Sequence, residues 1–159
     1  VKDRDITALG FLGSRAIGRK DYDKAIEYFE MALNLKPVNT VWTAEDLFWI
    51  GYCYYFKKDY KKSIEYFKKE LGIHKKKKRN EKILESHYNI AESYNMLGQY
   101  GKSIVHLDSA IYILDKLINS LGVQNKINLL DSHINIVQLQ VYNYFIMEDN
   151  LKLISFIEK

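Results

Sequence analysis

The side chains that could catalyse a reaction or bind a metal are few in this sequence. The four histidines, His74, His87, His106 and His133, lack the spacing of metal ligands, and Cys53 is the single cysteine. The sequence contains no glycine-rich phosphate loop, nucleophile elbow or carboxylate pair in a defined context. We therefore expect no catalytic residues, no bound metal and no cofactor, and we expect that the protein is not an enzyme.

One basic stretch could instead contact a charged partner. Residues 57–79, from Lys57 to Arg79, hold nearly half of the Lys and Arg residues, whereas the rest of the chain has more acids than bases. Its last part, the run from His74 to Arg79, could bind phosphate, an acidic partner or a nuclear import receptor, or it could be the solvated end of a long helix, where positive charge suits the helix dipole. We favour the solvated helix and expect no nucleic-acid partner. Salt-dependent binding to DNA would instead indicate that these residues contact nucleic acid.

The composition indicates a folded, all-helical chain in a reducing compartment. Of the 159 residues 47% are hydrophobic, with one Pro and eight Gly, so helix breakers are rare. The unpaired Cys53 is predicted to be a small buried residue, and it fits a reducing environment. No apolar run approaches the length of a membrane helix, and no signal peptide opens the sequence. We expect a cytoplasmic protein with no membrane partner.

A phrase that begins at Asp21 recurs along the chain. Asp21-Tyr-Asp-Lys-Ala-Ile-Glu-Tyr-Phe is echoed by Asp59-Tyr-Lys-Lys-Ser-Ile-Glu-Tyr-Phe and, more loosely, by Gln99-Tyr-Gly-Lys-Ser-Ile. A phrase repeated at this period signals stacked supersecondary units. Apolar residues at steps of three and four predict helices and no strand. The expected helices cover residues 6–20, 22–36, 43–56, 60–78, 81–97, 100–120, 125–147 and 151–158.

Residue types also predict how two of these helices begin or end. Thr43 is expected to cap the third helix, with Asp46 reaching back to complete a capping box. Gly122 is expected to follow the sixth helix as its left-handed terminal residue. Both predictions rest on local chemistry alone.

The spacing of small and aromatic residues resembles that of tetratricopeptide repeats (TPRs), most closely in the first three units. Members of this family pair two helices that approach closely at small residues, where a larger side chain would push them apart. The matching positions are Gly13, Tyr22, Ala25, Phe29 and Pro37 in the first unit, Gly51, Tyr60, Ser63 and Phe67 in the second, and Ala91, Tyr100, Ser103 and Leu107 in the third.

The resemblance implies an all-α protein built as a right-handed superhelical solenoid of antiparallel helix pairs. It implies one domain over residues 1–159, with units of about 6–39, 44–77 and 84–117 and a degenerate unit at 125–159. The offsets between units exceed the usual period of the family, as in its extended-repeat branches. The fourth unit keeps only its first helix clearly.

The resemblance also implies a binding face, because the first helix of each pair lines the concave side in this family. The expected partner-binding residues are Phe48, Tyr52, Tyr55, Phe56, Tyr88, Asn89, Glu92, Asn95, Asn135 and Gln138. We favour binding for the aromatic members, and the alternative is that they cover the core between units or pack under a further N-terminal segment. Asn89 and Asn135, which occupy equivalent places, could pair with a ligand backbone or only with water.

The function that the resemblance implies is protein binding. We expect a scaffold that holds a peptide or helix of a protein partner on the concave TPR groove. The alternative is the ligand-sensing TPR domain of a bacterial peptide-responsive regulator. A homo-oligomer that forms through the C-terminal unit is left open, because a degenerate last unit leaves apolar surface to be covered.

Overall fold

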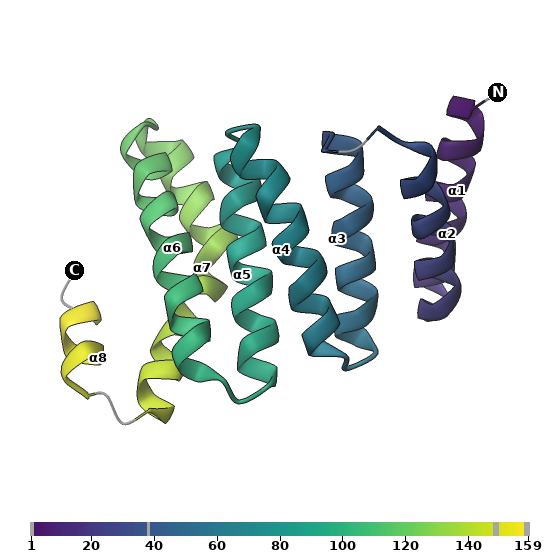
Figure 1. Cartoon of the computed structure of the whole chain (residues 1–159). Coiled ribbons are helices and arrows are strands. Elements are labelled where there is room, and N and C mark those ends of the chain that lie inside the picture. The colour runs from purple at the N-terminus through teal and green to yellow at the C-terminus, as the bar shows by residue number, and fades with distance from the viewer. Residues whose placement is uncertain (1, 38, 148–149, 158–159) are drawn as a thin grey trace. The chain divides into compact units, whose positions relative to one another are not determined.

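The structure is a computed structural model that describes residues 2–37, 39–147 and 150–157 (Figure 1). Over these residues every regular element is an α-helix, which confirms the all-α prediction. The chain divides into two compact units, Val1–Lys78 and Arg79–Lys159, and each unit has its own apolar core. Each unit contains four of the described helices, which follow one another as antiparallel pairs.

The first unit contains α1 (Lys2–Gly18), α2 (Tyr22–Leu35), α3 (Val41–Phe56) and α4 (Tyr60–Lys76). Each helix packs on the next one along the chain, so that α1 and α2 form one pair and α3 and α4 form the other. The buried residues that join the two pairs are Ala16, Ala25, Ile26, Phe29, Ile50 and Cys53. Cys53 is therefore buried, as predicted.

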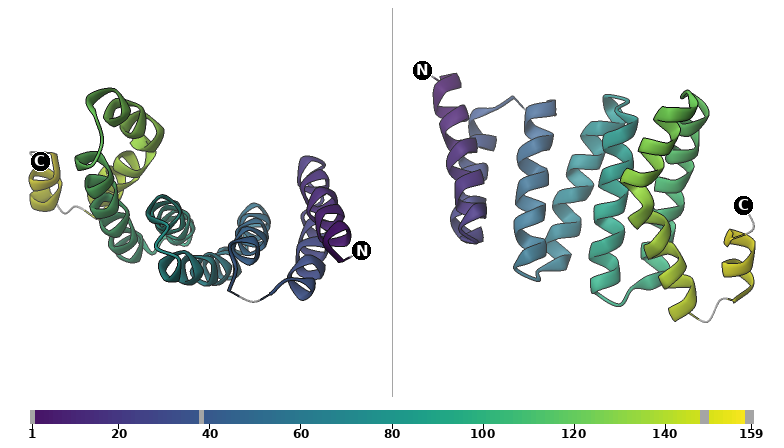
Figure 2. Two further views of the ribbon diagram at one scale, coloured as in Figure 1. Left: turned by 90° about the horizontal axis from the view of Figure 1, so that it is seen from above. Right: turned by 180° about the vertical axis from the view of Figure 1, so that it is seen from behind.

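The second unit contains α5 (Asn80–Met96), α6 (Tyr100–Asn119), α7 (Val123–Ile146) and α8 (Asn150–Ile157), as two views show (Figure 2). Helix α6 packs between α5 and α7, and α8 contacts α7 over a shorter stretch. The core residues of this unit are Leu84, Ala91, Leu107, Ala110, Leu114 and Ile136. The helices lie within a few residues of their predicted bounds, although Glu158, the last residue of the predicted eighth helix, lies outside the described residues.

Two glycines in the first unit allow close contact between the helices of a pair. A Cβ atom added to Gly13 would stand 2.6 Å from Cζ of Phe29 on α2. A Cβ atom added to Gly51 would stand 2.9 Å from Cδ1 of Phe67 on α4. Atoms at these distances overlap, so the close approach predicted from the small residues is confirmed at both positions.

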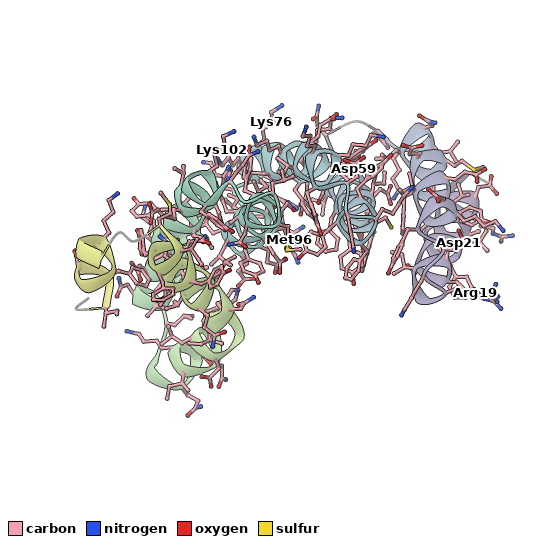
Figure 3. The ribbon with its side chains drawn as sticks, turned by 90° about the horizontal axis from the view of Figure 1, so that it is seen from below. Arg19, Asp21, Asp59, Lys76, Met96 and Lys102 are labelled. Atoms are coloured by element: carbon pink, nitrogen blue, oxygen red, sulfur yellow. The ribbon has the colours of Figure 1, made fainter. Side chains whose placement is uncertain are left out.

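The turns within the two pairs of the first unit share one design, and Figure 3 labels their capping residues Asp21 and Asp59. Asp21 caps α2 by accepting a hydrogen bond from the backbone N–H of Lys24, and Asp59 does the same at the start of α4. The residue before each aspartate is left-handed, with φ of 59° at Lys20 and 63° at Lys58. Glycine normally fills such positions because it has no Cβ, as Gly98 does at the turn after α5 with φ of 69°.

Both predictions about helix ends were wrong. Thr40, rather than Thr43, caps α3 and accepts from the backbone N–H of Thr43. Asp46 does not reach back to that end, because its carboxylate lies 2.5 Å from Nζ of Lys36 in a buried ion pair. Gly122 has a negative φ and stands at the N-cap of α7, so it does not terminate α6 in a left-handed conformation. In both cases tertiary contacts or the following helix decide the role of the residue.

Candidate functional site

A row of aromatic rings runs along α3 in the first unit. Tyr52 lies at the centre of this row, with its ring 6.2 Å from that of Phe48 and 4.6 Å from that of Phe56. The ring of Tyr55 lies 5.5 Å from that of Phe56 and contacts Tyr60 on α4 at the same distance. The four predicted residues of α3 therefore form one continuous surface, which we call the α3 aromatic row.

The α3 aromatic row rests on the core without being enclosed by it. Phe48 packs against the buried Phe67 at 6.0 Å, and Phe56 stacks on Tyr22 at the start of α2. Phe56 nevertheless remains 45% exposed, and the other three rings are half-buried. The row thus covers part of the core and also presents aromatic edges at the surface, and its role in binding a partner stays a prediction.

In the second unit, Tyr88 joins α5 to α7 through hydrogen bonds. Its hydroxyl donates to the carboxylate of Glu92 and accepts from the amide of Asn135. Burial is the main cause that raises the pKa of Tyr88, and the neighbouring Glu92 raises it further. The structure therefore brings together three predicted site residues, and the amide of Asn135 already has a partner within the protein.

A second chain of hydrogen bonds lies about two turns further along the same helices. The amide of Asn95 donates to the side-chain oxygen of Asn143, whose own amide donates to Oγ of Ser103 at 2.9 Å. Asn143 and Ser103 are fully buried. The predicted residue Asn95 thus links α5 to α7 and, through Asn143, to α6, a role that the sequence pattern did not reveal.

The last two predicted residues stay at the surface of the second unit. Asn89 is half-buried on α5, and its backbone carbonyl accepts from the hydroxyl of Ser93 at 2.9 Å. Gln138 is exposed on α7. Both side chains are open to solvent on the helices that the family uses for binding, and their role as contact residues stays a prediction.

Two contacts between titratable side chains were missed by the sequence interpretation. His87 is buried on α5, and its Nδ1 lies 3.0 Å from Nδ1 of His106 on α6, so that one ring donates to the other. His74 is also buried, with Nε2 at 3.3 Å from Oε1 of Glu70. The prediction that the basic run is solvated from His74 onwards is therefore wrong for its first residue. The helical spacing of the buried residues places His74 and His87 on buried faces, but it does not identify the side chains that they contact.

The remaining basic side chains of residues 57–79 are exposed, as predicted. Several lie over tyrosine rings, with Nζ of Lys62 at 5.0 Å from the ring centre of Tyr54 and Nζ of Lys69 at 4.7 Å from that of Tyr66. Among the described residues, no three His, Cys, Asp or Glu side chains come together as a metal site requires. Within the same part of the chain, none of the helices has the length and apolar character needed to cross a bilayer.

This helical architecture matches a protein-family model and several solved structures. Residues 18–110 match the protein-family model described as anaphase-promoting complex, cyclosome, subunit 3, whose repeats are TPR-like. The match covers more than half of the chain. The chain belongs to this TPR family. No curated protein shows significant sequence similarity to it.

Solved structures share the TPR fold over nearly the whole chain. RapI, solved in its apo form, is 20% identical with a TM-score of 0.77, and the match covers 98% of this chain and 54% of RapI. Aspartyl phosphate phosphatase F from Bacillus subtilis is 14% identical with a TM-score of 0.81, covering 98% of this chain and 39% of the phosphatase. The TPR domain of Arabidopsis FLU is 22% identical with a TM-score of 0.66, covering 73% of this chain and 99% of that domain.

These likenesses establish the TPR fold of consecutive helix pairs, which confirms the predicted fold class and the family resemblance. The chain spans about half the length of RapI and a smaller part of the phosphatase. A helical-repeat protein of this type is a scaffold for protein interactions. The structure places the predicted residues on α3, α5 and α7, the first helices of their pairs.

Proposed function

We propose that the chain binds a peptide or helix of a protein partner, with the α3 aromatic row as its main contact surface. The observation that supports this proposal is the partial exposure of four adjoining aromatic rings that are held from beneath by Phe67 and Tyr22. Aromatic side chains supply contact area with little loss of conformational entropy, and grouped exposed rings mark binding surfaces. The proposed role is binding rather than catalysis, in the cytoplasm.

We propose that the second unit has a polar contact surface of its own. Asn89 and Gln138 present amides that can both donate to and accept from a peptide backbone, whatever its sequence. Tyr88, Glu92 and Asn135 already bond to one another, so they offer a rigid polar surface with few side-chain rotamers left to freeze. Such an arrangement favours a partner whose backbone is accessible.

The experiment begins with random-sequence peptides displayed on their messenger RNA and selected on the wild-type protein. Fluorescence anisotropy then compares the wild type with the double variant Tyr52→Ala, Tyr55→Ala. Central aromatic contacts each contribute about 2 kcal/mol, so we expect affinity to fall by roughly thirtyfold or more. The matched control is Phe11→Ala, which removes a 67% exposed ring of α1.

Two outcomes would contradict this proposal. One is full affinity in the double variant while circular dichroism shows an intact fold, because the contact surface then lies elsewhere. The other is an unfolded double variant whose milder counterpart, Tyr52→Leu with Tyr55→Leu, folds and binds normally. In that case the rings serve only the core.

The second candidate is the ligand-sensing domain of a bacterial peptide-responsive regulator. The supporting observation is the match to RapI and to the Bacillus subtilis phosphatase, which extends over 98% of the chain. The two candidates differ in the length of peptide that is needed for full affinity. Trimming the selected peptides from both ends separates them, because a sensor binds a short free peptide with full affinity, whereas a scaffold requires a longer segment of its partner.

A further inference from the structure

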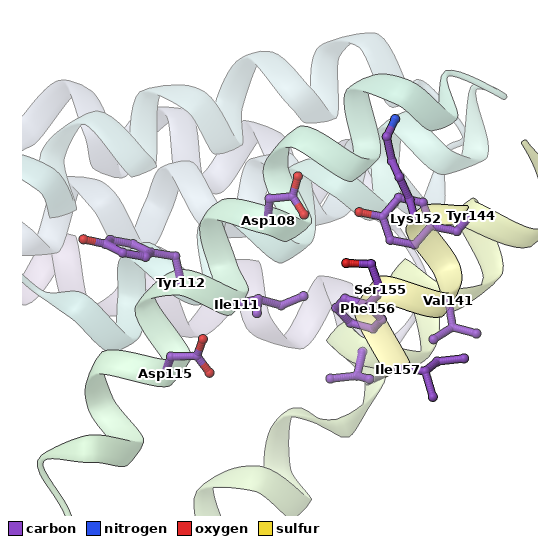
Figure 4. A pocket seen from close by; sticks show the side chains of 11 residues that line it. Asp108, Ile111, Tyr112, Asp115, Val141, Tyr144, Lys152, Ser155, Phe156 and Ile157 are labelled. Carbon is purple, nitrogen blue, oxygen red and sulfur yellow. The ribbon is translucent and has the colours of Figure 1, made fainter. Parts of the chain in front are cut away.

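A cavity of about 700 Å³ opens between α6, α7 and α8 in the second unit, away from the residues assigned so far (Figure 4). Its volume lies in the range of binding sites for side chains or small ligands. Residues of all three helices contribute to its walls. The lining residues used below are Asp108, Ile111, Tyr112, Asp115, Val141 and Phe156.

The cavity arises from the unequal lengths of the helices around it. Helix α7 has 24 residues and α8 has 8, which correspond to about 36 Å and 12 Å of helix. Because α8 follows directly after the end of α7, it covers only the last part of that helix. Further towards the start of α7, the apolar side chains of Ile127, Leu130 and Ile134 are exposed. The open strip beside α6 therefore has the shape that a second, longer helix would fill.

The chemistry of the cavity is apolar in the middle and acidic along α6. Ile111, Val141 and Phe156 supply aliphatic and aromatic surface, as the close view shows (Figure 4). Asp108 and Asp115 lie on the same helix two turns apart, which is about 10 Å. No ion pair or hydrogen bond involves the carboxylate of Asp115 among the described residues.

One end of the cavity is held in place by buried hydrogen bonds. The fully buried Gln140 donates from Nε2 to Oδ1 of Asp108 at 2.6 Å and to the hydroxyl of Tyr144 at 3.0 Å. Lys152 of α8 stands at the same end of the cavity (Figure 4). The other end lies at Asp115 and the 61% exposed Tyr112, where Nζ of Lys116 on α6 stands 4.4 Å from the centre of the Tyr112 ring and no described residue of α8 supplies a cation. A ligand with a positive charge at that end would therefore meet an available carboxylate.

We propose that this cavity receives one face of a cationic amphipathic helix from a protein partner. An apolar side chain of the partner enters between Ile111 and Phe156, while a Lys or Arg near it pairs with Asp115. A helix fits because the strip lies where a longer second helix of this pair would pack. The positive charge of the partner helix is inferred from the carboxylate of Asp115. This site is separate from the α3 aromatic row.

The test uses two synthetic helical peptides of Leu, Ala and Lys, with Leu along one face and either Lys or Glu beside it. Fluorescence anisotropy measures the affinity of each for the wild type and for Asp115→Asn. We expect the Lys peptide to bind and the Glu peptide not to bind. A single exposed charge pair contributes up to about fivefold in affinity, so Asp115→Asn should lose roughly that much.

Matched controls separate this site from general acidity and from the proposed groove. Glu81→Gln removes an exposed carboxylate at the start of α5, away from the cavity, and should leave the affinity unchanged. The double variant Tyr52→Ala, Tyr55→Ala should also bind the Lys peptide normally, so that the two proposals can fail separately. Equal binding of the Lys and Glu peptides, or equal losses in Asp115→Asn and Glu81→Gln, would overturn the proposal. So would a wild-type dimer in sedimentation that Asp115→Asn dissociates, since a second copy would then be the occupant.

Discussion

Replacing Gly13 by Ala tests directly how closely the first helix pair packs. The new Cβ would lie 2.6 Å from Cζ, 2.8 Å from Cε2 and 3.0 Å from Cε1 of Phe29, which is itself only 2% exposed. The ring is stacked on Trp49 at 6.3 Å and cannot swing into solvent. Overfilling a core at such a place costs about 1–3 kcal/mol. Alanine also favours a helix over glycine by up to about 1 kcal/mol, so the net loss against the wild type is about 0–2 kcal/mol.

The matched control is Gly10→Ala on the same helix. A Cβ at Gly10 meets nothing within 4 Å, so this change adds helix propensity without any clash and should stabilise the protein by about 0.5–1 kcal/mol. The difference between the two variants removes the propensity contribution. We expect Gly13→Ala to be less stable than Gly10→Ala by about 1–3 kcal/mol.

Urea denaturation followed by circular dichroism measures both free energies of unfolding. A third variant shows whether Phe29 is the cause, because Phe29→Leu shortens the opposing side chain. Gly13→Ala should cost less in the Phe29→Leu background than in the wild type. If Gly13→Ala is as stable as Gly10→Ala, or if its cost is the same in both backgrounds, contact with this ring does not explain why the position is glycine.

Three further predictions concern local features of the two units. Lys20→Gly should stabilise the protein by about 1 kcal/mol in thermal denaturation, because Lys20 has a left-handed φ of 59°. Gly98→Ala should destabilise the protein, because Gly98 has a φ of 69°. Changes of the opposite sign would contradict the argument that these backbone positions are strained. Lys36→Met should cost about 3 kcal/mol at pH 7 by leaving the carboxylate of Asp46 buried and alone. Burial already raises the pKa of Asp46 against the lowering effect of Lys36, so the pKa of Asp46 rises further without Lys36. The stability linked to a raised carboxyl pKa is present at low pH and is lost as the pH rises through that pKa. Urea titrations should therefore show that the loss of stability in Lys36→Met becomes smaller in acid. Burial raises the pKa of Cys53 to about 12, so a thiol reagent at pH 8 should modify it only in denaturant, and rapid labelling of the native protein would refute its burial.

The helix pairs could be predicted from the sequence because their determinants repeat. Gly13 and Gly51 stand opposite Phe29 and Phe67 in the same way, and the apolar period of each helix marks its buried face. The positions of the α3 aromatic residues on a first helix followed from the same register. That register predicts which residues share a face, and it does so without any knowledge of the contacts across the pair.

The parts that could not be predicted depend on contacts between distant residues. Asp46 looked like part of a cap, but a lysine ten positions earlier binds it. The contact between His87 and His106 joins two helices whose histidines have no recognisable spacing. The cavity beside α8 depends on how far that helix extends along α7. Local periodicity carries no information about such pairings, so only the structure reveals them.

The amide network of Asn95, Asn143 and Ser103 bears on how freely the repeats of this chain can be exchanged. In consensus arrays, neighbouring units are interchangeable because each interface buries similar apolar side chains. Here a hydrogen-bonded asparagine selects one alignment of α7 against α5 and α6, and a slip by one turn would leave buried amides unsatisfied. A chimera that grafts another repeat after α6 must therefore carry an equivalent of Asn143. The helices of the second unit therefore pack in one specific alignment, and a single repeat cannot be exchanged independently of its neighbours.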